Sequence, residues 1–477
     1  MERPVEKANI FAAKDRRQVV SHSLRRGAPR SRSPRARLAL VAAAVGVASC
    51  SHYTPLPLAA APPLAPSLQS VAPKAGPLTI DDVVALALAR NPDLVAARTK
   101  RAVARAQVAQ ARTIPNPSLT GAILPLLSGA GSGPAWNLGL AQDIKALLVY
   151  RPKVRAARDA AAQVDADLLW QEWQVAGQAR QLAADIILRD RQRQVLATAF
   201  QLLRHRYEVA QQALAARNIT LVTAAPSASG YQSARSNLQT LEQAQLQARH
   251  KLNALLALAP DAPLALSPTV DIPPLDVAAA RASLSTLPQR RPDLLALRFG
   301  YASQDENLRA AIRGQFPDLV LGGSIQSDSS QVINAGPNIQ VGVPVFDRNQ
   351  GNIAIARATR AQLNAEYSAR LATAVGEAGA LISEIEQLRA QRTAVVRDLT
   401  ATRLAAERAS RAFARSTIDE RSYVDLITAN FAKEQEVQNL DLALVERQVA
   451  LETLLGTGLP SVDTLALADP GTKGAAQ

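Results

Sequence analysis

The 477-residue sequence predicts a mainly α-helical protein with a small β part, built from two copies of one structural unit. Three observations predict this fold class. Aromatic residues make up only 4% of a chain that is 48% hydrophobic, so most of the apolar character comes from Ala, Leu and Val, which favours long helices packed side by side. Proline motifs recur at a fixed distance. Long proline-free stretches carry apolar residues at spacings of three and four.

The net charge of +14 is concentrated at the N-terminus. Residues 1–49 hold eleven Lys or Arg and three acidic residues, a net charge of +8, so the remaining 428 residues carry only +6. A folded part this mildly basic argues against a nucleic-acid partner. The single cysteine and four scattered histidines exclude a disulfide scaffold and a Cys-based metal cluster. Because no catalytic motif is visible either, we expect no enzyme, no metal site and no cofactor.

The N-terminus has the layout of a secretory signal. A basic segment precedes the short apolar stretch Leu38–Val47, and Cys50 follows after two small residues. This order resembles the bacterial lipoprotein cleavage box, so we expect a signal peptide over 1–49 and lipidation of Cys50. The alternative is a buried structural cysteine. Ser51 favours outer-membrane sorting by the same resemblance. Residues 50–77, rich in Pro and Ala, then predict an extended, lipid-anchored tether.

The rest of the chain contains an internal duplication. Asn91-Pro92-Asp93-Leu94 recurs as Arg291-Pro292-Asp293-Leu294, and Asn116-Pro117-Ser118-Leu119 recurs as Phe316-Pro317-Asp318-Leu319. In both pairs the prolines are 200 residues apart, which predicts two copies of one unit. We therefore expect a first repeat over 78–258, a proline-rich linker over 259–276, a second repeat over 277–457 and a flexible tail over 458–477.

Each repeat is predicted to run through the same elements. In the first repeat, a short helix spans Thr79–Arg90, with Thr79 and Asp82 as a capping box. A second helix begins at Pro92, where proline is tolerated in the first turn, and ends near Thr113. Two strands joined by a Gly/Ser/Pro-rich loop follow. A very long helix, a short turn and a second long helix complete the repeat.

Alternating residues predict the strands. Ile339 and Val341, followed by Val343 and Val345, alternate with polar or small residues in the second repeat, and the run from Trp136 to Leu140 does so in the first. Such segments are typical of transmembrane β-barrel strands, which are apolar outside and polar inside. The alternative is a soluble hairpin with one face on a core.

The long helices are predicted from the absence of proline. From about Asn352 to Arg415 no proline occurs, which corresponds to a helix of roughly 95 Å. Its counterpart in the first repeat runs from Pro152 to about Ala216. Apolar seams with spacings of three and four predict that these helices pack in pairs as coiled coils.

These elements cannot form a closed membrane sheet within one chain. One chain supplies about four candidate strands, and an open sheet edge cannot survive in lipid. Two chains would give eight strands with a filled interior, whereas three would give twelve strands and room for a conduit. The long helices would continue its wall as a helical tube.

The run Pro337–Ile353 resembles the strand-to-helix junction of TolC-like outer-membrane efflux proteins, and is most similar to the CzcC-like branch of heavy-metal and cation systems. The resemblance covers about residues 78–457. It implies a homotrimer with a shared 12-stranded β-barrel in the outer membrane and an antiparallel α-helical barrel through the periplasm. It also implies docking onto a periplasmic adaptor (a membrane fusion protein) and an inner-membrane resistance–nodulation–division (RND) pump.

The sequence departs from this family at the helix turns, where glycine is expected before each turn. Arg217 stands there in the first repeat and Arg415 in the second. We expect a basic ring that meets acidic adaptor residues. The alternative is a solvated arginine favoured by the helix dipole. The candidate docking residues are Arg217, Asn218, Thr220, Arg415, Ser416 and Asp419. Pro226 further predicts that the following helix begins near Ala225, after an irregular turn.

Charged residues near the second turn are candidates for a gate. Arg408 and Arg411 precede the turn, and Glu420, Arg421 and Asp425 follow it. Ion pairs among them would lock neighbouring helices together at the closed end of the tube. The alternative is a solvated charge run, because exposed ion pairs are weak.

The sequence thus predicts a passive conduit of a tripartite exporter, anchored in outer-membrane lipid and extending into the periplasm. Its cargo would be metal cations, drugs or other small molecules. Two alternatives stay open: a lipid-anchored periplasmic coiled-coil adaptor or scaffold without a pore, and the same channel serving type I protein secretion.

Overall fold

The computed structural model describes residues 53–61, 64–70 and 76–459. The chain divides into two units, Met1–Pro62 and Pro63–Gln477, and all of the helices and strands described below lie in the second. Cys50, the predicted signal peptide and most of the predicted tail lie outside the described residues. None of the helices described is both long and apolar enough to cross a membrane.

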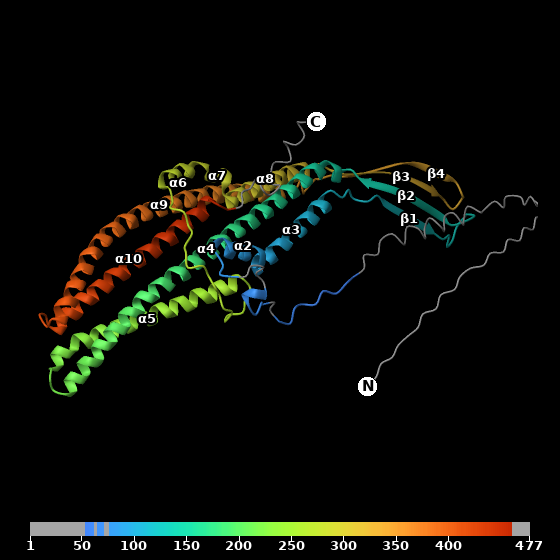
Figure 1. Cartoon of the computed structure of the whole chain (residues 1–477). Helices are drawn as coiled ribbons and strands as arrows, with labels where there is room; N and C mark the ends of the chain where they lie inside the picture. Colours follow the sequence, from blue (N-terminus) through green and yellow to red (C-terminus); the bar gives the residue numbers. More distant parts are fainter. Residues whose placement is uncertain (1–52, 62–63, 71–75, 460–477) are drawn as a thin grey trace, which may run out of the picture. The chain divides into compact units, whose positions relative to one another are not determined.

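The two repeats follow each other in one order, which confirms the mainly helical, duplicated fold (Figure 1). The first repeat contains α2 (Ile80–Arg90), α3 (Pro92–Ala111), β1 (Ser118–Leu124), β2 (Ala135–Asp143), α4 (Lys145–Ala215) and α5 (Leu221–Leu255), after the short η1 (Leu68–Ser70). The second contains α6 (Val277–Ser283), η2 (Leu284–Thr286), α7 (Leu287–Arg290), α8 (Pro292–Arg313), β3 (Asp318–Ser327), β4 (Ile333–Gly342), α9 (Gln350–Ala414) and α10 (Glu420–Leu455). The single helix α2 thus corresponds to three short pieces in the second repeat.

The four strands form one antiparallel sheet in the order β1-β2-β3-β4, and the pairing of β2 with β3 joins the repeats. Residues opposite each other on paired strands share a face. One face is apolar and largely exposed, with Leu119, Ile123, Leu138, Leu140, Leu321, Ile325, Ile333, Ile339 and Val341. The other carries Ser118, Thr120, Asn137, Ser324, Gln326, Asn334, Asn338 and Gln340. The predicted alternation is confirmed, although Val343 and Val345 lie beyond β4.

Helix α4 is longer than predicted because it begins at Lys145 and contains Pro152. Strand β2 passes almost directly into it, and the Ile144 amide donates to the Leu319 carbonyl at 2.8 Å. A proline inside a helix leaves the carbonyl four residues earlier without a partner. Here that carbonyl belongs to Leu148, and Nη1 of Arg313 donates to it at 3.3 Å. An α8 side chain therefore completes the hydrogen bonding of α4.

Helix α5 also contains its proline, so the expected start near Ala225 is wrong. The helix begins at Leu221, and the Thr220 hydroxyl accepts a hydrogen bond from the Thr223 amide at 3.4 Å. This cap forms the first turn before Pro226 is reached. The carbonyl that Pro226 leaves free belongs to Val222, whose side chain is exposed, so water can reach this turn.

The repeated Pro-Asp-Leu motifs start α3 and α8 in different ways. Asn91 caps α3 by accepting from the Leu94 amide at 3.0 Å, and its side-chain amide donates to the Leu255 carbonyl at 3.2 Å. Arg291 replaces Asn91 in the second repeat and is only 1% exposed. Its guanidinium forms two hydrogen bonds with Asp293, at 2.8 and 3.1 Å, and lies over the Trp170 ring. The second motif therefore holds α8 through a buried charge pair.

The C-termini of α5 and α10 share one turn geometry. Ala257 has φ 55° and Gly456 has φ 72°, so matched residues 199 positions apart are left-handed. A Cβ at Gly456 would also overlap the ring of Trp173, which is almost fully buried. Glycine at 456 is therefore favoured by the backbone conformation, which Ala257 also adopts, and required by the packing against Trp173.

We expect Gly456→Ala to lower the midpoint of thermal unfolding, followed as loss of helical circular dichroism. Gly458→Ala is the matched control, because Gly458 has φ 69° but only the tip of Arg180 at 4.0 Å. The control should lose about 1–2 kcal/mol of stability through backbone strain. Gly456→Ala should lose about 1–3 kcal/mol more, because Trp173 must move. Equal midpoints for the two variants would contradict the packing role.

Candidate functional site

The two turns that join the long helices are built alike. In the first, the Asn218 amide donates to the Ala213 carbonyl at 2.9 Å. In the second, the Thr417 amide donates to the Ala412 carbonyl, also at 2.9 Å. This bond between the second residue past the cap and a carbonyl of the last turn defines a Schellman motif. Each turn therefore depends on one left-handed residue.

The expectation that Arg217 and Arg415 are matched is wrong. The left-handed residues are Arg217, with φ 59°, and Ser416, with φ 56°, whereas Arg415 has φ −95°. The helix ends are offset by 199 residues between the repeats, one fewer than the proline motifs, so Arg415 matches Ala216. The left-handed conformation costs a non-glycine residue about 1–2 kcal/mol of stability. That residue is Arg217 in the first turn and Ser416 in the second.

The predicted docking residues divide into exposed side chains and helix caps. Arg217, Asn218, Arg415 and Ser416 are exposed at the turns. Thr220 caps α5, and Asp419 caps α10 by accepting from the Ser422 amide at 3.1 Å. Hydrogen bonds from Ser422 lower the pKa of Asp419.

The five predicted gate residues do not form one network. Arg421 and Asp425 pair at 3.9 Å with both side chains about two-thirds exposed, which adds little stability. Arg408 and Arg411 are exposed, and neither has an ion pair within the described part of the chain. Glu420 instead accepts from the Ser227 hydroxyl at 3.5 Å, and burial raises the pKa of Glu420.

An arginine that sequence reasoning missed links the two helical hairpins near these turns. The guanidinium of Arg206 on α4 lies 4.8 Å from the ring centre of Phe413 and 4.9 Å from that of Tyr423. These two rings, from α9 and α10, are stacked 4.6 Å apart. Burial raises the pKa of Glu420, and the positive charge of Arg206 offsets part of that rise. Arg206 thus joins the first hairpin to both helices of the second.

Other aromatic residues surround this contact, which we call the Arg206 clamp (Arg206, Phe413 and Tyr423). The Tyr207 and Tyr231 rings stack at 5.0 Å, and Phe200 lies 5.7 Å from Tyr231. The chain has only seventeen aromatic residues, so their concentration near the turns was a signal available in the sequence. What the sequence could not supply was the relative register of the two hairpins.

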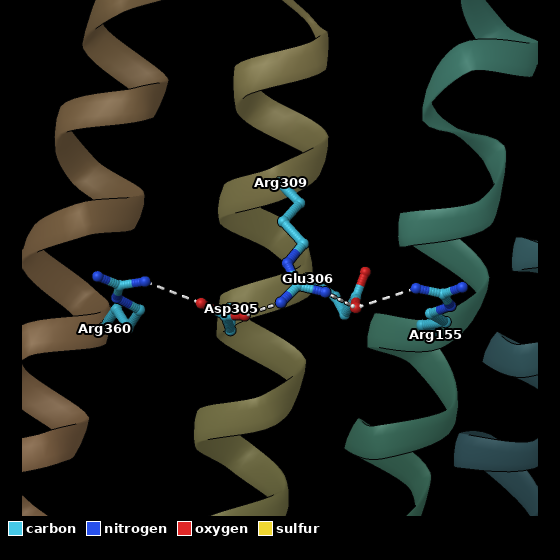
Figure 2. Close-up of polar contacts among 5 residues, drawn as sticks. All are labelled: Arg155, Asp305, Glu306, Arg309 and Arg360. Atoms are coloured by element: carbon cyan, nitrogen blue, oxygen red, sulfur yellow. Dashed lines mark hydrogen bonds and ion pairs between the residues drawn. The ribbon is translucent and has the colours of Figure 1, made fainter. Parts of the chain in front are cut away.

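A second polar network lies near the sheet end of the helices (Figure 2). Adjacent carboxylates on α8 reach in opposite directions: Asp305 to Arg360 of α9 at 2.8 Å, and Glu306 to Arg155 of α4 at 3.5 Å. Arg309 pairs with both, at 2.9 and 2.7 Å. Both long helices are thereby attached to α8. Among the described residues, no group of His, Cys, Asp or Glu could hold a metal ion.

We expect Arg206→Ala to loosen the turns. Cation–π contacts with partly buried rings contribute about 0.5–2 kcal/mol each. Amide hydrogen exchange in the α4–α5 and α9–α10 turns should therefore accelerate roughly tenfold or more. Arg204→Ala is the matched control, because Glu208, at an exposed site, is the one ion-pair partner of Arg204 among the described residues. Equal exchange rates in the two variants would show that the clamp does not stabilise the turns.

Comparisons with known proteins agree with this architecture. Residues 283–457 match the family model of the outer membrane efflux protein. The cation efflux system protein CusC of Escherichia coli O157:H7 is 26% identical over 179 residues, covering 35% of this chain and 39% of CusC. The probable outer membrane lipoprotein SilC of Salmonella typhimurium is 23% identical over 182 residues, with the same coverage. The matched segment thus spans about two-fifths of these relatives.

Solved structures match over more of the chain. The crystal structure of CusC has a TM-score of 0.64 at 20% identity, covering 85% of this chain and 99% of that chain. The open-state MtrE channel of Neisseria gonorrhoeae has a TM-score of 0.61 at 19% identity, covering 80% and 89%. At these identities the likeness concerns the fold alone. Residues 283–457 are thus similar to the outer membrane efflux protein family, and the chain as a whole has a fold similar to those of solved outer-membrane channels.

Proposed function

We propose that this chain forms the outer-membrane channel of a tripartite RND-type efflux system, a passive exit for substrates that an inner-membrane pump delivers. The observation that carries the proposal is the four-stranded sheet. One of its faces is apolar and exposed, and the other carries hydroxyl and amide side chains. A soluble scaffold would leave this apolar face in water, whereas a barrel wall turns it towards lipid.

The sheet also supports a homotrimer. Its edge strands β1 and β4 have no further strand beside them within the described chain. Open edges are not viable in lipid, because their backbone groups need hydrogen-bond partners. Pairing β4 of each copy with β1 of the next would repeat the β2–β3 pairing, and three copies would close a barrel of twelve strands.

The helical layer supports the same assembly through the duplication. Helix α8 packs on α4 within the chain, so we propose that α3 packs on α9 of a neighbouring copy. Leu295, Ser303 and Ala156 lie in or beside the α4–α8 contact and are 8, 7 and 5% exposed. Their duplicates Val95, Val103 and Ile355 are all apolar, yet 51, 58 and 65% exposed. A second copy would cover these apolar residues.

A pair of glycines gives the assembly a specific test. Gly177 of α4 faces α10 of the other repeat, and a Cβ there would overlap the Thr453 side chain. Its duplicate is Gly376 of α9, which has nothing within 4 Å in the single chain. We propose that α5 of a neighbouring copy packs on Gly376, as α10 packs on Gly177.

The polar face of the sheet is compatible with a passive conduit. Within the four strands, from Leu119 to Gln142 and from Leu319 to Val341, it carries no charged residue, and Asp328 lies in the turn between β3 and β4. Asp143 and Asp318 stand where the strands meet the helices, and Lys145 pairs with Asp318 at 2.7 Å. CusC is named as a cation efflux protein, and we propose metal cations as the first substrates to test, with drugs and small molecules as the alternative.

The turns are the proposed docking surface for a periplasmic adaptor. Arg217 and Arg415 are both exposed there, although they are not matched positions. The residues around the second turn remain our candidates for the gate, with the Arg206 clamp holding the hairpins that would have to separate.

The trimer predicts that Gly376→Leu blocks assembly without unfolding the chain. Leucine favours the helix more than glycine does, so the helical circular dichroism should not fall. Native mass spectrometry in detergent should show at least a tenfold drop in trimer. Gly379→Leu is the control, since its duplicate is Arg180, a position that accommodates a long side chain. A fully trimeric Gly376→Leu protein would contradict the proposed interface.

The function is tested by reconstituting the purified protein in planar lipid bilayers and by cross-linking it in cells. We expect ion-conducting pores and recovery of an adaptor and an RND pump. Recovery of the adaptor should fall at least tenfold with Arg217→Glu/Arg415→Glu. Recovery of a protein-secretion ATPase would favour the type I alternative. A Cys50→Ala variant that is a soluble monomer without conductance would support the scaffold.

A further inference from the structure

An unusually basic pocket lies where the end of α3 meets the first turns of α4. The cavity has a volume of about 230 Å³ and is lined by Arg112, Tyr150, Arg151, Val154, Arg155 and Arg158. Four of these six residues are arginines and none is acidic. Within the described part of the chain, Arg112, Arg151 and Arg158 have no ion pair. We call this site the arginine pocket.

The walls of the pocket are held by contacts outside it. The Tyr150 hydroxyl donates to the Arg112 carbonyl at 3.3 Å, which ties α4 to the end of α3. Arg155 is oriented by Glu306 at 3.5 Å, but Arg309 takes the same oxygen at 2.7 Å. The five residues of Figure 2 carry three positive and two negative charges, and the Arg155 side chain remains 59% exposed. Glu306 therefore neutralises the positive charge of Arg155 only in part, and the remainder acts on the pocket.

The nearest acidic groups offset only part of the positive charge of the pocket. Burial and the charge of Glu306 raise the pKa of Asp159, while the positive charges of Arg155 and Arg158 act to lower it. Glu306 is shared between two arginines. Within the described residues, Arg112 and Arg151, at the end nearest the sheet, have no acidic partner.

The second repeat shows that the fold does not need these arginines. Helices α8 and α9 meet in the same way, and the matched positions there are Ile312, Gln350 and Ala354 in place of Arg112, Arg151 and Arg155. Only Arg158 is retained, as Arg357. Four neighbouring arginines repel one another, and only Arg155 among them has an ion pair in the described part of the chain, so this cluster, which occurs in one repeat alone, favours the binding of an anion.

The position of the pocket identifies the class of anion. Tyr150 and Arg158 follow the start of α4 by five and thirteen residues, so they lie roughly 8–20 Å beyond the end of β2. Leu147 and Leu148, which are almost half exposed, separate the sheet from the pocket. Lipid headgroups extend about 5–8 Å beyond the hydrocarbon core, so the end of the pocket at Tyr150 and Arg151 lies at their outer limit and Arg158 lies beyond them. Arginine binds phosphate through paired N–H groups.

We propose that the arginine pocket binds the phosphate of a membrane phospholipid headgroup, with Arg112 and Arg151 as the main donors. The anion chemistry stands on the pocket itself. The lipid as the source of the phosphate rests on the proposed function, because it requires the sheet to lie in a membrane. Each proposed trimer would carry three such sites.

The test uses full-length protein in detergent, titrated with phosphatidylglycerol and followed by native mass spectrometry. Arg112→Ile/Arg151→Gln places the residues of the second repeat in the pocket and leaves the Figure 2 network intact. We expect its affinity for phosphatidylglycerol to fall at least tenfold, while Arg357→Gln, the matched control, leaves it unchanged. Unchanged binding by the double variant would overturn the proposal. If the double variant does not fold, Arg151→Gln alone should still weaken binding threefold or more.

Two further arms identify the source of the phosphate. Diacylglycerol, which lacks the phosphate, should bind equally weakly to wild type and to the double variant. Inorganic phosphate that binds the wild-type pocket as tightly as the lipid does would overturn the lipid assignment in favour of a soluble anion. Bilayer conductance is measured on the same preparations. A conducting protein without lipid binding refutes this inference alone, whereas lipid binding without conductance refutes the proposed channel.

Discussion

The structure depends on the need of every sheet edge and helix face to be covered. Within the chain, the first repeat packs on the second through the pairs β2–β3, α4–α8 and α4–α10. The equivalent surfaces on the far sides of the two repeats have no partner in the single chain as described. These uncovered surfaces include the outer edges of β1 and β4 and the exposed apolar residues Val95 and Ile355. Because the repeats are duplicates, the uncovered surface of the first repeat should fit the uncovered surface of the second repeat of another copy. The proposed ring is the arrangement in which a neighbouring copy supplies what the next repeat supplies within the chain.

The long helices are attached firmly at two levels with different chemistry. Near the sheet, the carboxylates of Asp305 and Glu306 on α8 bind arginines of both α4 and α9. Near the turns, Arg206 lies against aromatic rings and has little ion pairing. Charge pairs with fixed partners suit an end that stays in place, whereas flat rings can slide past a guanidinium at small cost. The two ends of one helix pair are therefore suited to different amounts of movement.

Most of the fold could be predicted from the sequence, because proline spacing, residue alternation and long apolar seams are local signals. The predicted helix from Asn352 to Arg415 differs from α9 by two residues at its start and one at its end. One error arose where a distant residue decides the structure. Pro152 stays inside α4 because Arg313 takes the Leu148 carbonyl. Of the candidate site, the sequence identified the turns but not the Arg206 clamp, since that depends on the register between hairpins.

The hydrogen bond from Arg313 to Leu148 also sets an order of events during synthesis. The donor follows its acceptor by 165 residues, so the first turns of α4 gain this hydrogen bond only after the early part of the second repeat, through Arg313, has been synthesised. Until then the Leu148 carbonyl needs water as its partner. The adjoining apolar strand β2 likewise waits for β3. The first two strands and the start of α4 therefore reach their final hydrogen bonding only once α8 and β3 of the second repeat have been made.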